Sequence, residues 1–221
     1  MDELDQFYCD LKQGISIGKL RQRFPEILRF VHENDLTCDM RLARGRVKEL
    51  RDEIAPGFAF AQTIHSDADS LQFPLDAGPI DLNISGPTRN IRRVQITLAQ
   101  ARERYNLMTE LNEAGLSAGY LGHTDDEPTA NFKEAMERGR IMHATAGTQR
   151  TLIKAISLCL KKKSDPKGAD TLLIEAPLNS LPEARIIEIL PELSNLAQAS
   201  AFGHIYVIGT GERRGEPLAI K

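Results

Sequence analysis

The chain has 221 residues, a formal net charge of −3 and a sequence pI near 6.0. This length accommodates either one large domain or one domain with an appendage. The mildly acidic total argues against a protein that coats nucleic acid nonspecifically, although it is compatible with a local basic surface. Cys9, Cys38 and Cys159 are far apart and lack CxxC spacing, which argues against a disulfide framework and against a zinc site.

The first residues are acidic and amphipathic, unlike the basic and then apolar pattern of a secretory signal. No apolar run approaches the roughly 18 residues that a membrane-spanning helix needs. Together with the cysteine pattern, these features lead us to expect a cytoplasmic chain with no membrane partner.

Residues 1–57 are predicted to form an N-terminal helical region, in three segments broken at Gly14, at 33–35 and at 56–57. The third segment carries a cluster of basic side chains, which are Arg41, Arg44, Arg46, Lys48 and Arg51. Two interpretations remain open for this cluster: a helix-turn-helix-like contact with DNA, or a solvated helix face with intrahelical ion pairs such as that of Arg46 with Glu49.

Residues 58–221 are predicted to form a separate α/β domain. The apolar segments 58–64 and 69–75 are interpreted as the first strand and the approach to the next one. Residues 79–85 and 93–98 then alternate between apolar and polar side chains, which predicts a two-stranded hairpin. Because successive strand side chains point to opposite faces, a suitable register gathers one polar set on a single surface, namely Asp81, Asn83, Arg93, Gln95 and Thr97.

The remaining elements indicate the class of fold. A patterned helix covers 99–114 and ends at Gly115, and another helix begins at Thr148. Residues 171–175 form a continuous apolar strand, the kind found in a sheet that is covered on both faces. A helix and a last strand near His204 follow, which implies a parallel pair with a right-handed crossover. We therefore expect antiparallel strands before Ala99, parallel strands after it, and helices on both faces.

The segment Pro79-Ile80-Asp81, followed by Gln95-Ile96-Thr97, resembles the motif of the PD-(D/E)XK nuclease superfamily. The core of that family runs helix, three antiparallel strands, helix, strand, so the resemblance implies an α/β fold with a mixed sheet of the restriction-endonuclease-like type. Asp81 stands at the position of the family's first acid, whereas Gln95 and Thr97 replace the second acid and the lysine. The charged pair of the family is therefore absent from this motif.

The resemblance also implies a catalytic site formed by Asp81, Gln95 and Thr97. Asp81 would hold Mg²⁺ with help from the Gln95 amide, Glu53 or Asp76, and the ion would activate water. Glu53 corresponds to an acid that the family often places on the helix before its first strand. As alternatives, Glu53 is an ordinary exposed helix glutamate and Asp76 is a turn former.

Nucleic-acid contacts are expected from the polar residues at the end of the hairpin and in the following helix, which are Arg93, Gln100, Arg102 and Arg104. Some members of the family place a glutamine and a tyrosine there, and Gln100 with Tyr105 approximates that pair. In the alternative interpretation, Tyr105 packs in the core and the arginines are solvated.

These features lead to three functional hypotheses. The first is a metal-dependent nuclease, or a nuclease-derived protein, that acts on nucleic-acid phosphodiesters. The second is a catalytically inactive protein of the same fold that serves as a binding, assembly or immunity module with a protein partner. The third is a DNA-binding regulator that uses the N-terminal helices. Under the first hypothesis, Asp81→Ala is expected to leave thermal stability nearly unchanged, because an exposed strand carboxylate contributes little to folding.

Overall fold

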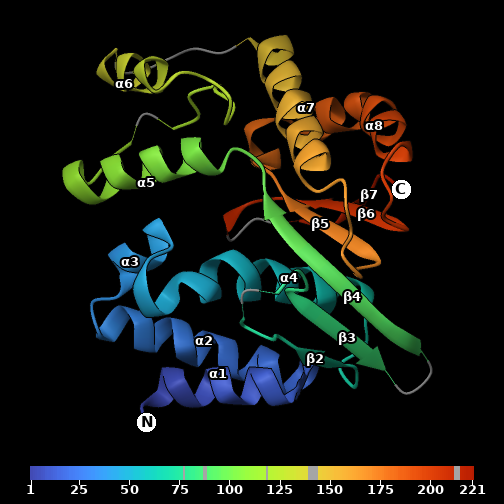
Figure 1. The fold of residues 1–221 in the computed structure, drawn as a ribbon. Coiled ribbons are helices and arrows are strands. Elements are labelled where there is room, and N and C mark those ends of the chain that lie inside the picture. The colour runs from blue at the N-terminus through green and yellow to red at the C-terminus, as the bar shows by residue number, and fades with distance from the viewer. Residues whose placement is uncertain (77, 87–88, 118, 139–143, 212–214) are drawn as a thin grey trace.

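The computed structural model describes the chain except for residues 77, 87–88, 118, 139–143 and 212–214. Its described residues form an α/β fold around a seven-stranded mixed sheet of order β1-β2-β3-β4-β5-β6-β7 (Figure 1). Strands β1 to β4 are antiparallel, β4, β5 and β6 are parallel, and β7 is antiparallel to β6. The strands are β1 (Ile15–Ser16), β2 (Ser70–Gln72), β3 (Leu82–Gly86), β4 (Arg89–Leu98), β5 (Thr171–Glu175), β6 (His204–Ile208) and β7 (Leu218–Ala219). The predicted change from antiparallel to parallel strands is confirmed.

Helices cover both faces of this sheet, as predicted (Figure 1). The first face carries α1 (Glu3–Gln13), α2 (Ile17–Glu33), α3 (Thr37–Leu42), the 3₁₀-helix η1 (Gly45–Val47), the π-helix η2 (Leu50–Ile54) and α4 (Ala55–Ile64). The second face carries α7 (Thr145–Lys162) and α8 (Glu183–Gln198). Three further elements are α5 (Ala101–Ala114), which follows β4, α6 (Thr129–Glu137), and the 3₁₀-helix η3 (Leu178–Ser180), which follows β5.

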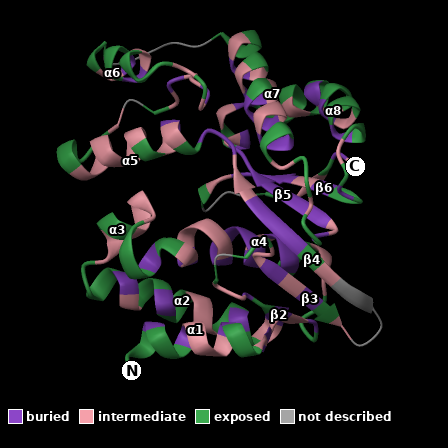
Figure 2. Cartoon of the chain, in the orientation of Figure 1, coloured by how far each residue is buried: buried purple, intermediate pink, exposed green. Residues whose placement is uncertain are grey.

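Two apolar cores lie on opposite faces of the sheet because the strand side chains alternate. In β5 every residue is buried, with Leu173 in the first core and Leu172 and Ile174 in the second. Figure 2 shows further buried residues in the neighbouring strands, at 94–96 of β4 and at 205, 207 and 208 of β6. A strand that is covered on both faces has a continuous apolar sequence, which explains why β5 could be predicted correctly.

The segment 58–64 was predicted to be a strand, and this prediction is wrong because it belongs to helix α4. Phe58 and Phe60 imitate strand alternation, but α4 is buried almost all round and so lacks the apolar stripe that reveals a surface helix. Pro56 is the second residue of α4 and directly follows the π-helix η2, so its missing N–H falls within a continuous helical segment. Gly57 permits close packing, since a Cβ there would lie 2.9 Å from Cε1 of Phe73.

The N-terminal helices share their core with the sheet. Leu4, Phe7 and Leu20 belong to the same buried cluster as Leu82 and Val94. Helix α4 runs through the predicted boundary between residues 57 and 58, and the short strand β1 lies within the region that was expected to be helical throughout. Helix α1 does end at Gly14, whose φ of 104° suits glycine. Among the residues that the structure describes, no helix is long and apolar enough to cross a membrane.

Candidate functional site

Asp81 lies at the point where β3 begins beside β4. Its backbone N–H donates to the carbonyl of Val94 at 3.0 Å, and its Oδ2 accepts a hydrogen bond from the backbone N–H of Ile96 at 2.6 Å. The carboxylate thus binds a β4 amide just beyond the Leu82–Val94 pair. Asp81 is partly buried, so the expectation of an exposed strand carboxylate was wrong.

Glu53 on η2 interacts electrostatically with Asp81. Burial, followed by repulsion from Asp81, raises the pKa of Glu53 to about 7. Burial also raises the pKa of Asp81, whereas the Ile96 amide and the positive charges of Lys163 and Lys48 act in the opposite direction. Lys163 directly follows α7, and Lys48 lies between η1 and η2. Two carboxylates and two ammonium groups from separate segments therefore interact in one region, which we call the Asp81 site.

Gln95 and Thr97 point to the face that α7 covers. They pair with Leu172 and Ile174 of β5, both of which belong to the second core. Gln95 is only 5% exposed, and its Oε1 has no hydrogen-bond partner among the described residues. Thr97 lies near Cys159 of α7, whose pKa it lowers against the larger, opposite effect of burial. The part of the predicted polar face that carries Gln95 and Thr97 is thus covered by α7.

The buried thiol of Cys159 provides a test of this covered face. Burial raises the pKa of Cys159 to about 11, so the unreactive thiol form dominates at pH 8. We expect iodoacetamide to modify the exposed Cys38 in the native protein and to reach Cys159 only after unfolding. Peptide mass spectrometry measures both rates, and equal native labelling of the two cysteines would contradict the observed packing of α7 against β4.

Asp76 and Arg93 lie at the periphery of the hairpin. Asp76 is exposed, and its Oδ1 accepts a hydrogen bond from the N–H of Gly78 at 2.7 Å, as in a turn former. Its negative charge nevertheless contributes to the raised pKa of Asp81. Arg93 is exposed and lies opposite Asn83 of β3, which is the face-to-face pairing expected for the hairpin.

Gln100 connects the end of β4 to a distant loop. Its Nε2 donates to the carbonyl of His123 at 2.7 Å and to Oε2 of Glu103 at 3.2 Å. Glu103 in turn accepts hydrogen bonds from the N–H groups of His123 at 2.6 Å and Leu121 at 3.3 Å. Burial raises the pKa of Glu103 to about 7. This buried pair holds residues 121–123 against the first turn of α5, a role that local sequence patterns did not indicate.

Arg102 organises the neighbouring part of the same loop. Its Nη1 donates to the carbonyl of Asp125 at 3.3 Å, and its Nη2 donates to the carbonyl of Glu127. Its guanidinium also lies over the ring of Phe132, 4.3 Å from the centroid. Arg102 was predicted to contact nucleic acid; its Nη1 and Nη2 form hydrogen bonds within the chain, whereas its Nε has no partner among the described residues.

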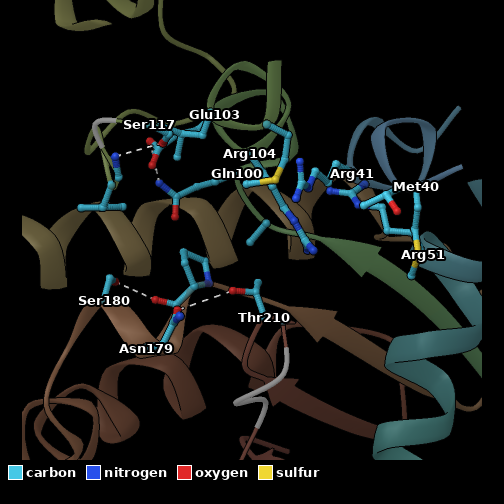
Figure 3. A pocket seen from close by; sticks show the side chains of 18 residues that line it. Met40, Arg41, Arg51, Gln100, Glu103, Arg104, Ser117, Asn179, Ser180 and Thr210 are labelled. Atoms are coloured by element: carbon cyan, nitrogen blue, oxygen red, sulfur yellow. Dashed lines mark hydrogen bonds between the residues drawn. The ribbon is translucent and has the colours of Figure 1, made fainter. Parts of the chain in front are cut away.

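A cavity of about 760 Å³ lies at the carboxyl ends of β4, β5 and β6, and we call it the strand-end pocket. Three of the side chains that line it are basic, namely Arg41, Arg51 and Arg104. Figure 3 shows these arginines gathered on one side, away from a neutral polar group formed by Asn179, Ser180 and Thr210. The sequence placed Arg41 and Arg51 only on a basic helix face, since nothing local indicates that η2 and α3 meet the ends of these strands.

Comparison with models of protein families, with curated proteins and with solved structures finds no significant match. In the part of the chain that the structure describes, no group of three or more His, Cys, Asp and Glu side chains could hold a metal ion. The function therefore has to be inferred from the Asp81 site and the strand-end pocket.

Proposed function

We propose that the protein has a fold of the restriction-endonuclease-like type and cleaves nucleic-acid phosphodiesters at the Asp81 site with Mg²⁺. The proposal is carried by two partly buried carboxylates from different segments, Asp81 and Glu53, where the negative charge of Asp81 contributes to the raised pKa of Glu53. The order of antiparallel strands followed by parallel strands agrees with such a fold.

The charges of the Asp81 site favour a functional role over a structural one. Placing two carboxylates near each other in a partly buried region opposes their ionisation, and strongly shifted pKa values are typical of functional sites. The π-helical turn that carries Glu53 is also a form of helix that occurs frequently at such sites. A bound cation would relieve the repulsion between Asp81 and Glu53.

The side chains present suit magnesium. Mg²⁺ keeps several waters and is usually held by one or two carboxylates together with substrate phosphates, a set that Asp81 and Glu53 would supply. The buried Oε1 of Gln95, which lacks a partner among the described residues, is a further neutral oxygen on the same hairpin. When bound, the ion would supply an activated water and neutralise developing phosphate charge. In this proposal, Lys163 and Lys48 supply the positive charge that the family's lysine would provide at position 97.

The test is a cleavage assay of single- and double-stranded DNA and RNA with Mg²⁺, Mn²⁺ or EDTA. We expect metal-dependent cleavage whose rate rises as the pH increases through about 7, because Glu53 must lose its proton before it can bind a cation. Absence of cleavage of all these substrates between about pH 6 and pH 9 would contradict the proposal, given the range in which such carboxylates ionise.

Glu53→Gln is expected to change activity and stability in opposite directions. The folded-state pKa of Glu53 lies above its ordinary value of 4.5, so folding favours the protonated form and the stability contributed by Glu53 falls as pH rises from 4.5 to about 7. The neutral variant should therefore be less active but more stable than the wild type at pH 8, as measured by cleavage rate and urea unfolding. Glu33→Gln, at an exposed position of α2, is the charge-matched control. A less stable Glu53→Gln protein would count against the assigned environment.

The DNA-binding regulator hypothesis receives less support from the basic cluster. Arg46 pairs with Asp2, the N-cap of α1, at 2.7 Å and with Asp5 of α1 at 2.8 Å, in place of the expected pair with Glu49. The guanidinium of Arg44 hydrogen-bonds Tyr105. Arg46 thus contacts the start of α1, and Arg44 contacts α5. These contacts favour an intramolecular role for both arginines. The inactive-module hypothesis is favoured by one observation, the packing of Thr97 against Cys159 where the family has its lysine.

A further inference from the structure

We infer that the strand-end pocket binds a phosphorylated nucleoside, with the phosphate at the arginine side and the nucleoside against the apolar and neutral polar walls. In open α/β sheets, ligands bind in crevices outside the carboxyl ends of the strands, which is where this pocket lies. Its volume of about 760 Å³ falls in the range of small-molecule sites. The inference does not depend on cleavage at the Asp81 site.

Two of the three pocket arginines have a carboxylate partner, and the buried Glu103 also lines the pocket. Arg51 is only 11% exposed and pairs with Asp52 at 2.6 Å, while its Nε has no hydrogen-bond partner among the residues described. Nη1 of Arg104 lies 3.2 Å from Oε2 of Glu175. Burial, followed by repulsion from Arg104, lowers the pKa of Arg51. These two arginines are thus close enough to repel each other in spite of their acidic neighbours.

Arg41 adds a third positive charge to the same side. Its Nη1 donates to Oδ1 of Asn112 at 3.1 Å, which is a neutral partner and leaves the charge uncompensated by that contact. Guanidinium groups present donors in a planar fork that matches phosphate oxygens, and charge-assisted hydrogen bonds of this kind are stronger than neutral ones. A phosphate monoester is therefore the anion that this arrangement fits.

The other walls suit the uncharged body of a nucleoside. Met40, Leu107, Met108 and Pro177 supply apolar surface, and methionine side chains adapt well to flat rings. Across the pocket, Oγ1 of Thr210 lies 3.5 Å from Oδ1 of Asn179, a long contact that leaves both groups able to turn towards a ligand (Figure 3). Amide and hydroxyl groups recognise the polar edges of bases and sugar hydroxyls.

The first test is titration calorimetry of the full chain in EDTA, where metal-dependent cleavage does not interfere. The probes are the four ribonucleoside monophosphates, the matching nucleosides, ribose 5-phosphate and inorganic phosphate. We expect at least one nucleoside monophosphate to bind with a Kd below about 1 mM, at least about tenfold more tightly than its nucleoside and than inorganic phosphate, because each of these lacks one half of the contacts. Equal binding of the nucleoside or of inorganic phosphate would overturn the inference, as would no binding by any monophosphate.

A 5′-phosphorylated dinucleotide distinguishes between a free nucleotide and the end of a nucleic-acid strand as the natural ligand. Tighter binding of the free monophosphate would identify a small-molecule ligand, and tighter binding of the dinucleotide would identify the end of a nucleic-acid strand. Both results support a site for a phosphorylated nucleoside.

Two variants with matched controls locate the binding. Asn179 is exposed, so Asn179→Asp should fold normally while it adds a negative charge to the pocket and weakens nucleotide binding about fivefold or more. Asn195→Asp makes the same change at an exposed position of α8 and should have no effect.

Arg41→Gln should weaken binding about tenfold, whereas Arg29→Gln, at an exposed position of α2, should not. Unchanged binding by both Asn179→Asp and Arg41→Gln would overturn the assignment, as would equal losses in the controls.

Discussion

Asp81→Asn is expected to lower Mg²⁺-dependent cleavage by about 10³-fold or more without loss of the fold. The amide oxygen of asparagine can still accept the hydrogen bond that Asp81 takes from the Ile96 N–H at 2.6 Å. The substitution removes the negative charge that the proposed site needs to hold a cation, and metal ions supply several kcal/mol of stabilisation to such transition states. The measurement is the single-turnover cleavage rate, with urea unfolding of the same protein.

Asp35→Asn is the matched control for this experiment, because Asp35 is exposed and its φ of 56° is tolerated by asparagine. Asp81→Ala would be a less clean test than the sequence suggested, since it also removes the acceptor for a partly buried amide, at a cost of about 1–3 kcal/mol. Cleavage by Asp81→Asn at the rate of the wild type would exclude Asp81 from the chemistry.

Glu103→Ala is expected to lower the free energy of unfolding by about 2–4 kcal/mol. Glu103 is 3% exposed, and alanine at its position leaves the N–H groups of Leu121 and His123 without their acceptor. The Gln100 amide loses one of its two acceptors. Each buried donor without a partner costs about 1–3 kcal/mol, and partial access of water to the loop reduces the sum. Urea unfolding at pH 8, where the carboxylate is mostly ionised, measures the difference.

Glu113→Ala serves as the control for Glu103→Ala, because Glu113 is exposed near the end of the same helix α5. It should change the free energy of unfolding by less than about 0.5 kcal/mol, as is usual for surface substitutions. A similarly small change for Glu103→Ala would show that the loop 121–123 is held in place by other contacts.

Local periodicity explains which parts of the fold could be predicted. Alternation in 93–98 and the continuous apolar run in 171–175 identified β4 and β5, because their burial follows directly from side-chain direction. The same reasoning failed for α4, whose burial on nearly all sides leaves no helical stripe to detect. Pro56 also suggested an interruption, whereas η2 leads directly into α4.

The sites were harder to predict than the strands, because they depend on contacts between distant segments. The hairpin pattern placed Asp81 beside the second strand, where it hydrogen-bonds Val94 and Ile96 on either side of Gln95. It carried no information about Lys163, which reaches this region from the end of α7, or about the helix that covers Thr97. The strand-end pocket was not foreseen, since its arginines come from α3, η2 and α5.

The wide turn of η2 fixes the relative direction of two side chains that are only two positions apart. Arg51 lines the strand-end pocket, and Glu53 interacts with Asp81. A π-helical turn contains about one residue more than an α-helical turn, and each residue of an α-helix turns the chain by about 100°. Deleting one residue from Leu50–Ile54 would therefore rotate one of the two side chains away from its present neighbours. The extra residue makes this short segment a spacer whose length both sites require.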